Sequence, residues 1–295
     1  MAGTAAFVVN RSRVRDWEQV SGRCRAAAAA RGWTPLLLET AADDAGAGLT
    51  HRALAAGAGL VFAVGGDGTV RACAQALAGT RVPLAIVPRG TANLTARALG
   101  VPAELEAALG AGFGHHERPI DLAAADGITC AAMAGIGVDA AVIGATPDGL
   151  KRSAGWLAYA AVGARHALGP RTTFRIRLDD APPLTRQARS VVVGNAGLLP
   201  GGFPLLPDAR LDDGALDVAI LAPSSPLGWA RVGYRVMTGS RHDDRRLERH
   251  QARRIEIHAA GELPREVDGE VISPGRSLTV TVVPAALLVR VPGPP

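Results

Sequence analysis

Lysine is almost absent from this sequence of 295 residues: Lys151 is the only one, and the formal net charge of +5 therefore rests on arginine. A Walker P-loop requires a lysine after its glycines at the start of a helix, and a protein kinase requires one on its third strand. Lys151, in the context Asp-Gly-Leu-Lys, fits neither pattern. Both classes are excluded, and a bound phosphate would be met by arginine, backbone amides or a metal ion.

Cysteine is also scarce, and no long apolar run occurs. Cys24, Cys73 and Cys130 are odd in number and contain no C-x-x-C pair, so the sequence predicts neither a disulfide framework nor a zinc site. The apolar run near the N-terminus lacks the basic leader of a secretory signal. The longest uncharged stretch, 190–207, is interrupted by glycine and proline, unlike a membrane-spanning helix. We expect a cytoplasmic protein that can touch a membrane without crossing it.

The first 120 residues alternate between strand-like and helix-like segments, which is typical of a parallel sheet covered by helices. Apolar strand-like runs and alanine-rich helical stretches follow one another along this half of the chain. The expected strands are 5–9, 33–39, 60–64 and 84–87, and the expected helices are 17–31, 51–57, 70–78 and 92–99.

Beyond residue 120 most strand-like runs are separated by turns, which indicates a mainly antiparallel β-sandwich domain. The last residues, 285–291, have the pattern of a segment that returns to the first domain. We therefore predict an α/β domain of residues 1–120 together with 285–295, and a β-rich domain of residues 121–284. The expected strands of the second domain are 173–178, 191–193, 216–221, 254–259 and 278–283, and its expected helices are 155–168 and 226–237.

The most informative segment is Gly65-Gly-Asp-Gly-Thr69, where a buried strand meets a glycine-rich turn that opens a helix. Glycines allow backbone amides to approach phosphate oxygens, the start of a helix offers unpaired N–H groups, and Asp67 can recruit a cation. The alternative is an ordinary tight turn in which Asp67 or Thr69 caps the helix. Its strand–turn–helix context favours a phosphate-binding loop.

A second loop, Pro88-Arg-Gly-Thr-Ala-Asn93, also follows a buried strand and precedes a helix. The carboxyl ends of parallel strands share one edge of a sheet, so the two loops are expected to lie together. Thr91 and Asn93 could then donate hydrogen bonds to nucleotide oxygens. Taken alone, the segment would read as a helix start capped by threonine.

With two further segments, these loops resemble the four motifs of the diacylglycerol kinase-like catalytic domain, a family that includes sphingosine kinases and bacterial lipid kinases. The further segments are Leu211-Asp-Asp-Gly-Ala-Leu-Asp217 and Val267-Asp-Gly-Glu270. The resemblance spans nearly the whole chain and keeps the order of the motifs. It implies an ATP-binding α/β domain of the NAD kinase/diacylglycerol kinase type, a C-terminal β-sandwich, and catalysis between them.

The resemblance also implies a role for each motif in binding ATP and Mg²⁺. Asp67 would lie near the phosphates and hold the catalytic magnesium, and Thr40, after the second strand, would approach the nucleotide. The implied nucleotide-binding residues are Asn10, Thr40, Gly65, Gly66, Asp67, Gly68, Thr69, Gly90, Thr91 and Asn93.

In the C-terminal motifs, Asp268 or Glu270 would take the proton from the lipid hydroxyl, and the other would help to hold magnesium. A separate structural magnesium would use the carboxylate of Asp213 and the backbone carbonyls of Arg210 and Ala215. Carboxylate-held magnesium and arginine can neutralise the negative charge of phosphoryl transfer, and a nearby carboxylate can act as the base. The alternative is that both Asp-Gly segments are simple hairpin turns.

The first loop departs from the family pattern. Relatives usually carry Asn-Pro and a nearby Ser-Gly after the first strand, whereas this chain reads Asn10-Arg-Ser-Arg-Val-Arg15. Arg13 could stand in as a basic phosphate ligand, or it could belong to a solvated helix entrance. Arg71 replaces an asparagine that is common in relatives.

The segment 241–254 contains six arginines and three acidic residues. A solvated surface is the default interpretation, and attraction to anionic lipid headgroups, with peripheral contact at the inner face of a membrane, is the rival. Nucleic-acid binding is not predicted, because no aromatic side chains are interleaved with the arginines. The sequence leaves a homodimer open.

The resemblance thus predicts transfer of the ATP γ-phosphate to a hydroxyl of diacylglycerol or a related lipid. The alternatives are an NAD kinase, which shares the Gly-Gly-Asp-Gly loop, and a non-catalytic nucleotide-binding or membrane-binding relative. The identity of the lipid is not predicted, since chain selectivity depends on the shape of an ordinary apolar pocket.

Overall fold

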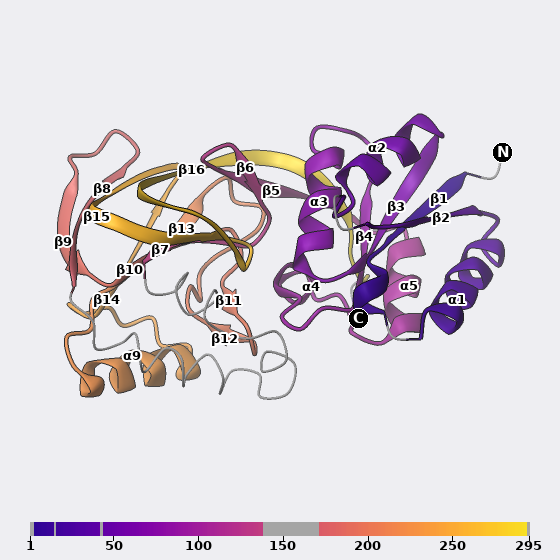
Figure 1. Ribbon diagram of the computed structural model, residues 1–295. Helices are drawn as coiled ribbons and strands as arrows, with labels where there is room; N and C mark the ends of the chain where they lie inside the picture. The colour runs from indigo at the N-terminus through magenta and orange to yellow at the C-terminus, as the bar shows by residue number, and fades with distance from the viewer. Residues whose placement is uncertain (1–2, 15, 42–43, 138–170, 294–295) are drawn as a thin grey trace. The chain divides into compact units, whose positions relative to one another are not determined.

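The computed structural model describes residues 3–14, 16–41, 44–137 and 171–293. The chain divides into two compact units (Figure 1). The first unit consists of Met1–Ile120 and Ala285–Pro295, and the second consists of Asp121–Pro284.

The first unit is built on a parallel sheet with the strand order β2-β1-β3-β4. These strands are almost continuously apolar because helices cover both faces of a parallel sheet. The end of β16 joins the sheet, where Val289 pairs with Leu84 of β4 in the parallel direction. The strands are β1 (Thr4–Val9), β2 (Thr34–Glu39), β3 (Ala58–Gly65) and β4 (Leu84–Pro88).

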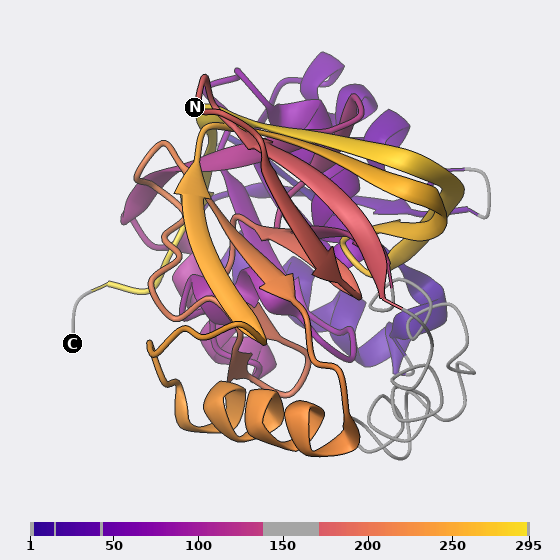
Figure 2. The ribbon, with the colours of Figure 1, turned by 90° about the vertical axis from the view of Figure 1, so that its left-hand side faces the viewer.

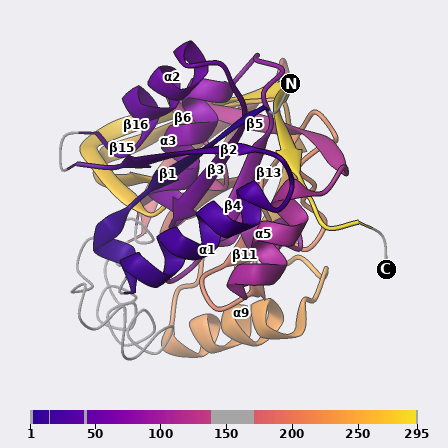
Figure 3. The same ribbon diagram turned by 90° about the vertical axis from the view of Figure 1, so that its right-hand side faces the viewer.

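Helices lie on both faces of this sheet: α2 and α3 pack together on one face, and α1 and α5 on the other (Figure 3). The core under α5 gathers three of the five phenylalanines of the chain. Phe7 and Phe62 stack at 4.6 Å between ring centroids, and Phe113 tilts against Phe62 at 4.7 Å. The helices are α1 (Trp17–Ala29), α2 (Ala47–Ala55), α3 (Asp67–Leu77), α4 (Leu94–Ala98) and α5 (Leu105–Phe113), preceded by the 3₁₀ turn Arg11–Arg13.

Helix α5 was not predicted from the sequence. Two glycines, Gly110 and Gly112, lower its intrinsic helix propensity. The helix is fixed instead by a side-chain cap, since the carboxylate of Glu104 accepts hydrogen bonds from the backbone N–H groups of Glu106 and Ala107 at 2.9 and 2.6 Å.

The second unit is mainly antiparallel, as Figure 2 shows. Its strands run in the order β14-β13-β10-β7-β15, and β15 also pairs with β16 and β8. The described strands are β5 (Glu117–Ala125), β6 (Ile128–Cys130), β7 (Met133–Gly137), β8 (Thr172–Leu178), β9 (Leu184–Ala188), β10 (Ser190–Gly194), β11 (Leu198–Leu199), β12 (Phe203–Pro204), β13 (Leu216–Leu221), β14 (Leu247–Ala252), β15 (Arg254–Val267) and β16 (Glu270–Arg290).

Two apolar clusters form the core of this unit. Alternate side chains of β8, β10, β13 and β15, among them Phe174 and Ile257, make the larger cluster. Helix α9 (Pro226–Thr238) contributes Val232 and Val236 to the smaller one. Among the described residues, no helix is both long and apolar enough to span a membrane.

The predicted fold class, a parallel α/β domain followed by a β-sandwich-like domain, is confirmed. Strands β15 and β16 are much longer than the expected 254–259 and 278–283. Proline and glycine suggested breaks, but irregularities in the register between His258 and Arg265 accommodate them within one hairpin. The helix expected at 155–168 lies outside the described residues.

Candidate active site

The predicted nucleotide-binding residues gather at one edge of the parallel sheet. Asn10 follows β1, Thr40 follows β2, and the two glycine loops follow β3 and β4. Because these strands are parallel and in register, their carboxyl ends meet at the same edge. A hydrogen bond of 2.7 Å from the N–H of Arg89 to the carbonyl of Gly65 joins the two glycine loops directly.

The two loops touch through glycine on both sides. A Cβ atom on Gly90 would lie 2.5 Å from the Cα atom of Gly66, and one on Gly66 would lie 3.1 Å from the Cα atom of Gly90. A side chain at position 90 would clash with the backbone of Gly66, and one at position 66 would make a tight contact with Gly90. These glycines therefore serve the close packing of the loops as well as the predicted approach of phosphate.

Position 65 requires glycine for a different reason. A Cβ atom there would lie 2.5 Å from the Oγ1 atom of Thr69, whose buried side chain folds back over the end of β3. Thr69 is thus part of the packing of the turn. The N-cap residue of α3, Gly66, provides no side-chain cap.

Asp67 caps the other helix. Its Oδ1 atom accepts hydrogen bonds from the backbone N–H groups of Leu94 at 2.6 Å and Thr95 at 3.4 Å, at the start of α4. Those N–H groups have no partner within the helix. The carboxylate of the first loop therefore also fixes the helix that follows the second.

The side chain of Asn93 makes two hydrogen bonds within its own loop. Its Oδ1 atom accepts a hydrogen bond from the N–H of Gly90 and its Nδ2 atom donates to the carbonyl of Gly90, both at 2.9 Å. The residue has a left-handed backbone with φ of 49°. Asn93 closes the loop, whereas Thr91 is exposed at the edge and does not cap α4.

The predicted catalytic turn joins β15 to β16 in the second unit. Val267 pairs with Glu270, and the two residues between them, Asp268 and Gly269, have φ values of 50° and 79°. Positive φ at both central positions is typical of a type I′ hairpin turn. The hairpin predicted as an alternative is present, and it sets Asp268 and Glu270 two positions apart.

Asp268 is buried and surrounded by backbone donors. Its carboxylate accepts hydrogen bonds from the N–H groups of Ala131 at 2.8 Å, Ala132 at 2.8 Å and Met133 at 3.0 Å. Its own N–H donates to the carbonyl of Met133. Glu270, in contrast, is exposed. Of the two carboxylates, Asp268 is the one that holds the turn in place.

Two further side chains contact this turn, Glu266 as an acceptor and Cys130 as a thiol donor to Asp268. Glu266, 2% exposed, accepts a hydrogen bond from the N–H of Gly269 at 2.8 Å. The thiol of Cys130 lies beneath Asp268, and burial, followed by the charges of Asp268 and Glu266, raises the pKa of that thiol well above its ordinary value. Cys130 therefore remains a neutral thiol.

The Asp-Asp-Gly segment forms a turn as well. Gly214 has a φ of 72° and donates its N–H to the Oδ2 atom of Asp121 at 2.7 Å. Asp213 accepts from the N–H of Ala215 at 3.1 Å and from the Nε2 atom of Gln251 at 3.0 Å.

The carboxylate of Asp213 in this turn affects the pKa of Asp217. Burial raises the pKa of Asp217 to about 6, and the carboxylate of Asp213 adds to the rise. Among the described residues, no group of three or more His, Cys, Asp or Glu side chains could hold a metal ion. A cation at Asp213 would therefore depend on backbone carbonyls, such as those predicted at Arg210 and Ala215, and it would relieve the charge that Asp217 meets.

Comparison with known proteins agrees with this arrangement of loops. Residues 4–125 match the diacylglycerol kinase catalytic domain, and residues 132–291 match the YegS C-terminal NAD kinase beta sandwich-like domain. The "Probable lipid kinase YegS-like" of Pseudomonas aeruginosa (strain UCBPP-PA14) is 36% identical over 254 residues, which cover 83% of this chain and 80% of that protein. The chain belongs to the diacylglycerol kinase catalytic-domain family.

Solved structures of lower sequence identity show the same fold. A diacylglycerol kinase from Bacillus anthracis str. Sterne superposes with a TM-score of 0.76 at 22% identity, covering 98% of this chain and 97% of that chain. An NAD kinase from Archaeoglobus fulgidus in complex with ATP superposes with a TM-score of 0.54 at 12% identity, covering 97% and 93%. The fold is therefore shared between diacylglycerol kinases and NAD kinases.

Two residues that support these turns, Asn195 and Asp121, were not singled out in the sequence analysis. Asn195 is buried and donates from Nδ2 to the carbonyls of Asp121 at 2.7 Å and Ala131 at 3.2 Å. Asp121, in turn, holds Gly214. The only signal in the sequence was a polar residue directly after the buried strand β10.

Several arginines of the segment 241–254 are paired with carboxylates. Arg249 pairs with Asp243 at 2.8 Å, Arg246 pairs with Asp244 at 2.7 Å, and Arg254 pairs with Glu256 at 2.9 Å. Paired charges attract an anionic surface less than free ones, so this geometry favours the solvated-surface interpretation of 241–254.

Proposed function

We propose that this chain is an ATP-dependent lipid kinase that transfers the γ-phosphate of ATP to a hydroxyl of diacylglycerol or a related lipid. The observation that carries the proposal is the direct packing of two glycine loops, through Gly66 and Gly90, at the carboxyl edge of the parallel sheet. The names of the relatives point to the same class of reaction.

The nucleotide would lie along this edge. The N–H groups at the start of α3 would donate to phosphate oxygens, and the aligned peptide dipoles of a helix favour negative charge at its N-terminus. Asn10, Thr40 and Thr91 follow three of the four strands and would contact the rest of the nucleotide.

Magnesium would be held by the carboxylate of Asp67. A bound Mg²⁺ supplies neutralisation of the charge that develops on the phosphate oxygens. The donor set fits Mg²⁺, which commonly binds through one or two carboxylates, substrate phosphates and water and needs no all-protein cage. The second ion would use Asp213 and the carbonyls of Arg210 and Ala215.

We assign the base to Glu270. It would take the proton of the lipid hydroxyl as the oxygen of that hydroxyl bonds to the γ-phosphorus and the bond from this phosphorus to ADP breaks. Glu270 is exposed and can meet a substrate, whereas the carboxylate of Asp268 already accepts three backbone hydrogen bonds. Asp268 would act as a positioning residue that orients the turn.

The test is a transfer assay with purified protein, magnesium and ATP labelled at the γ-phosphate. One reaction contains diacylglycerol in mixed micelles, and a parallel reaction contains NAD. We expect label in a phospholipid and none in NADP. Label in NADP alone would favour the NAD kinase alternative, and tight ATP binding without transfer to either acceptor would favour a non-catalytic relative.

A further inference from the structure

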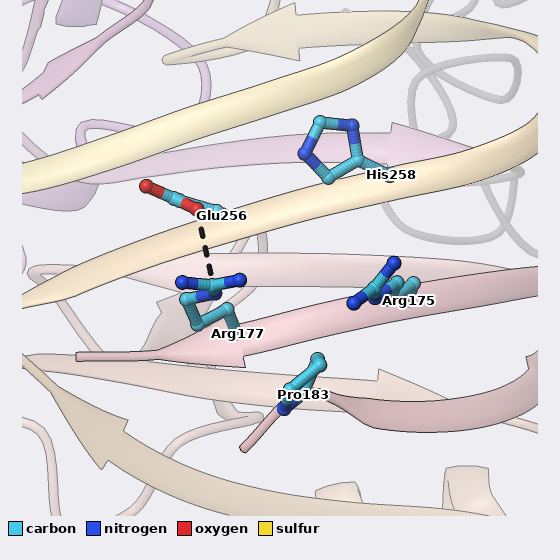
Figure 4. Close-up of a pocket in the computed structure, with 5 residues that line it drawn as sticks. All are labelled: Arg175, Arg177, Pro183, Glu256 and His258. Carbon is cyan, nitrogen blue, oxygen red and sulfur yellow. Dashed lines mark ion pairs between the residues drawn. The ribbon is translucent and has the colours of Figure 1, made fainter. Parts of the chain in front are cut away.

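A second polar site lies on the outer face of strands β8 and β15 in the second unit. It is a cavity of about 280 Å³ lined by Arg175, Arg177, Pro183, Glu256 and His258. Figure 4 shows the two arginines side by side on β8, with Glu256 and His258 on the neighbouring strand β15. None of these residues belongs to the motifs of the proposed kinase site.

The strand register places these side chains together. Arg175 lies directly opposite His258, and Arg177 lies directly opposite Glu256, in the antiparallel pair of β8 and β15. Residues that alternate with them, such as Ile176, are fully buried in the core. The period of two in a strand therefore sends all four polar side chains to the same outer face.

The charges on this face do not cancel. Glu256 is shared between Arg254, at 2.9 Å, and Arg177, at 3.8 Å. In the part of the chain that the structure describes, Arg175 has no hydrogen-bond or ion-pair partner and its cross-strand neighbour is another base, His258. No carboxylate therefore lies directly opposite Arg175 in this pair of strands.

We propose that this cavity binds a phosphate-type anion between Arg175, His258 and Arg177. A guanidinium presents a planar fork of donors that matches the oxygens of a phosphate group, and an imidazole adds a further donor. Four of the five residues that line the cavity are charged or polar, and three of them are arginine or histidine. A free phosphate and the phosphomonoester headgroup of a lipid offer the same chemistry.

The contrast with segment 241–254 supports this proposal. There, arginines such as Arg249 and Arg246 each have a carboxylate within 2.8 Å. The outer face of β8 keeps two guanidiniums beside one carboxylate that a third arginine already shares.

The first experiment measures binding of inorganic phosphate by calorimetry, at constant ionic strength with chloride as the counter-ion. Because a hydrogen bond to a charged group contributes a few kcal/mol, we expect Arg175→Gln to weaken binding by about tenfold or more. Arg253→Gln is the matched control: it removes one exposed positive charge near the start of β15 but does not line the cavity, and it should leave binding unchanged.

The second experiment separates the two sources. Vesicles of phosphatidylcholine, with and without phosphatidic acid, are sedimented with the wild type, Arg175→Gln and Arg253→Gln. Retention that requires both phosphatidic acid and Arg175 identifies a lipid headgroup, whereas calorimetric binding without such retention identifies a free phosphate. Equal behaviour of the wild type and Arg175→Gln in both experiments would overturn the proposal. Glu270→Gln should bind as the wild type does, so a failure of the kinase assignment would not affect this result.

Discussion

The Oδ1 atom of Asp67 accepts a hydrogen bond of 2.6 Å from the backbone N–H of Leu94, 27 positions further along the chain. A residue predicted to act on phosphate and magnesium is thus also the cap of the helix after the second loop. The loss of Asp67 would change both the chemistry and the shape of the site, so a simple alanine variant cannot separate the two roles.

Asparagine separates them. Asp67→Asn keeps an oxygen that can accept from Leu94, whereas Asp67→Ala removes the cap, which costs about 1 kcal/mol of stability with a range of roughly 0.5–2 kcal/mol. We expect Asp67→Asn to unfold in urea close to the wild type and Asp67→Ala to unfold earlier. Both should lose lipid phosphorylation by orders of magnitude, because an amide is a poor magnesium ligand. An active Asp67→Asn enzyme would show that the cap is the only role.

The contact between the loops gives a second prediction. Gly90→Ala would place its Cβ atom 2.5 Å from the Cα atom of Gly66, and backbone atoms cannot move aside cheaply. Overpacking of this kind costs about 1–3 kcal/mol. We expect a lower midpoint of urea unfolding and a weaker affinity for ATP, measured by calorimetry.

Gly110→Ala is the control for that substitution. Gly110 lies inside α5, and a Cβ atom there would meet nothing within 4 Å. Alanine should stabilise the helix by about 0.5–1 kcal/mol, because it has the higher helix propensity. If Gly90→Ala behaved like Gly110→Ala, the loops would not need their glycines for packing.

The position of the two glycine loops at one edge of the sheet was predictable, because the sequence signals for it are local. A buried strand followed by glycines and a helix start is visible within ten residues, and parallel strands bring such loops together. The partners of Asp67, Asn93 and Asp268 were not predictable. Asp268 contacts Ala132 at a separation of 136 positions, and no local pattern encodes such a bond. The structural contacts of these side chains therefore became visible only in the fold.

A third prediction concerns the turn between β15 and β16. Asp268→Asn would replace one carboxylate oxygen of this side chain by an NH₂ group. In the wild type the carboxylate oxygens accept from three backbone N–H groups, and at least one of these would then face a donor. A buried donor that loses its acceptor lowers the free energy of unfolding by about 1–3 kcal/mol, and by more if the lost acceptor was charged. We expect Asp268→Asn to be clearly less stable in urea than the wild type.

Glu270→Gln should behave in the opposite way. The side chain is exposed, so stability should change by about 0.5 kcal/mol or less. Loss of the proposed base should lower kcat by about 10²–10⁴. A stable but inactive Asp268→Asn together with an active Glu270→Gln would reverse the assignment of the base.

The last prediction follows from Asp217, whose pKa burial and the charge of Asp213 raise to about 6 from an ordinary value of 3.8. The folded state then holds the proton more tightly than the unfolded state, so this group lowers stability as the pH rises from about 4 to 6 and has no further effect above that range. At 1.36 kcal/mol per pKa unit, the loss is on the order of 3 kcal/mol.

Asp217→Asn should remove that loss, so the difference in unfolding free energy between Asp217→Asn and the wild type should rise across this window in urea titrations with EDTA present. If a magnesium ion binds at Asp213, its positive charge would lower the pKa of Asp217 and reduce this difference when EDTA is replaced by magnesium. A difference that is flat with pH in EDTA would show that Asp217 is not held in an unfavourable charged form. A difference that magnesium leaves unchanged would speak against a cation beside Asp213, because a divalent charge close to Asp217 must act on its ionisation.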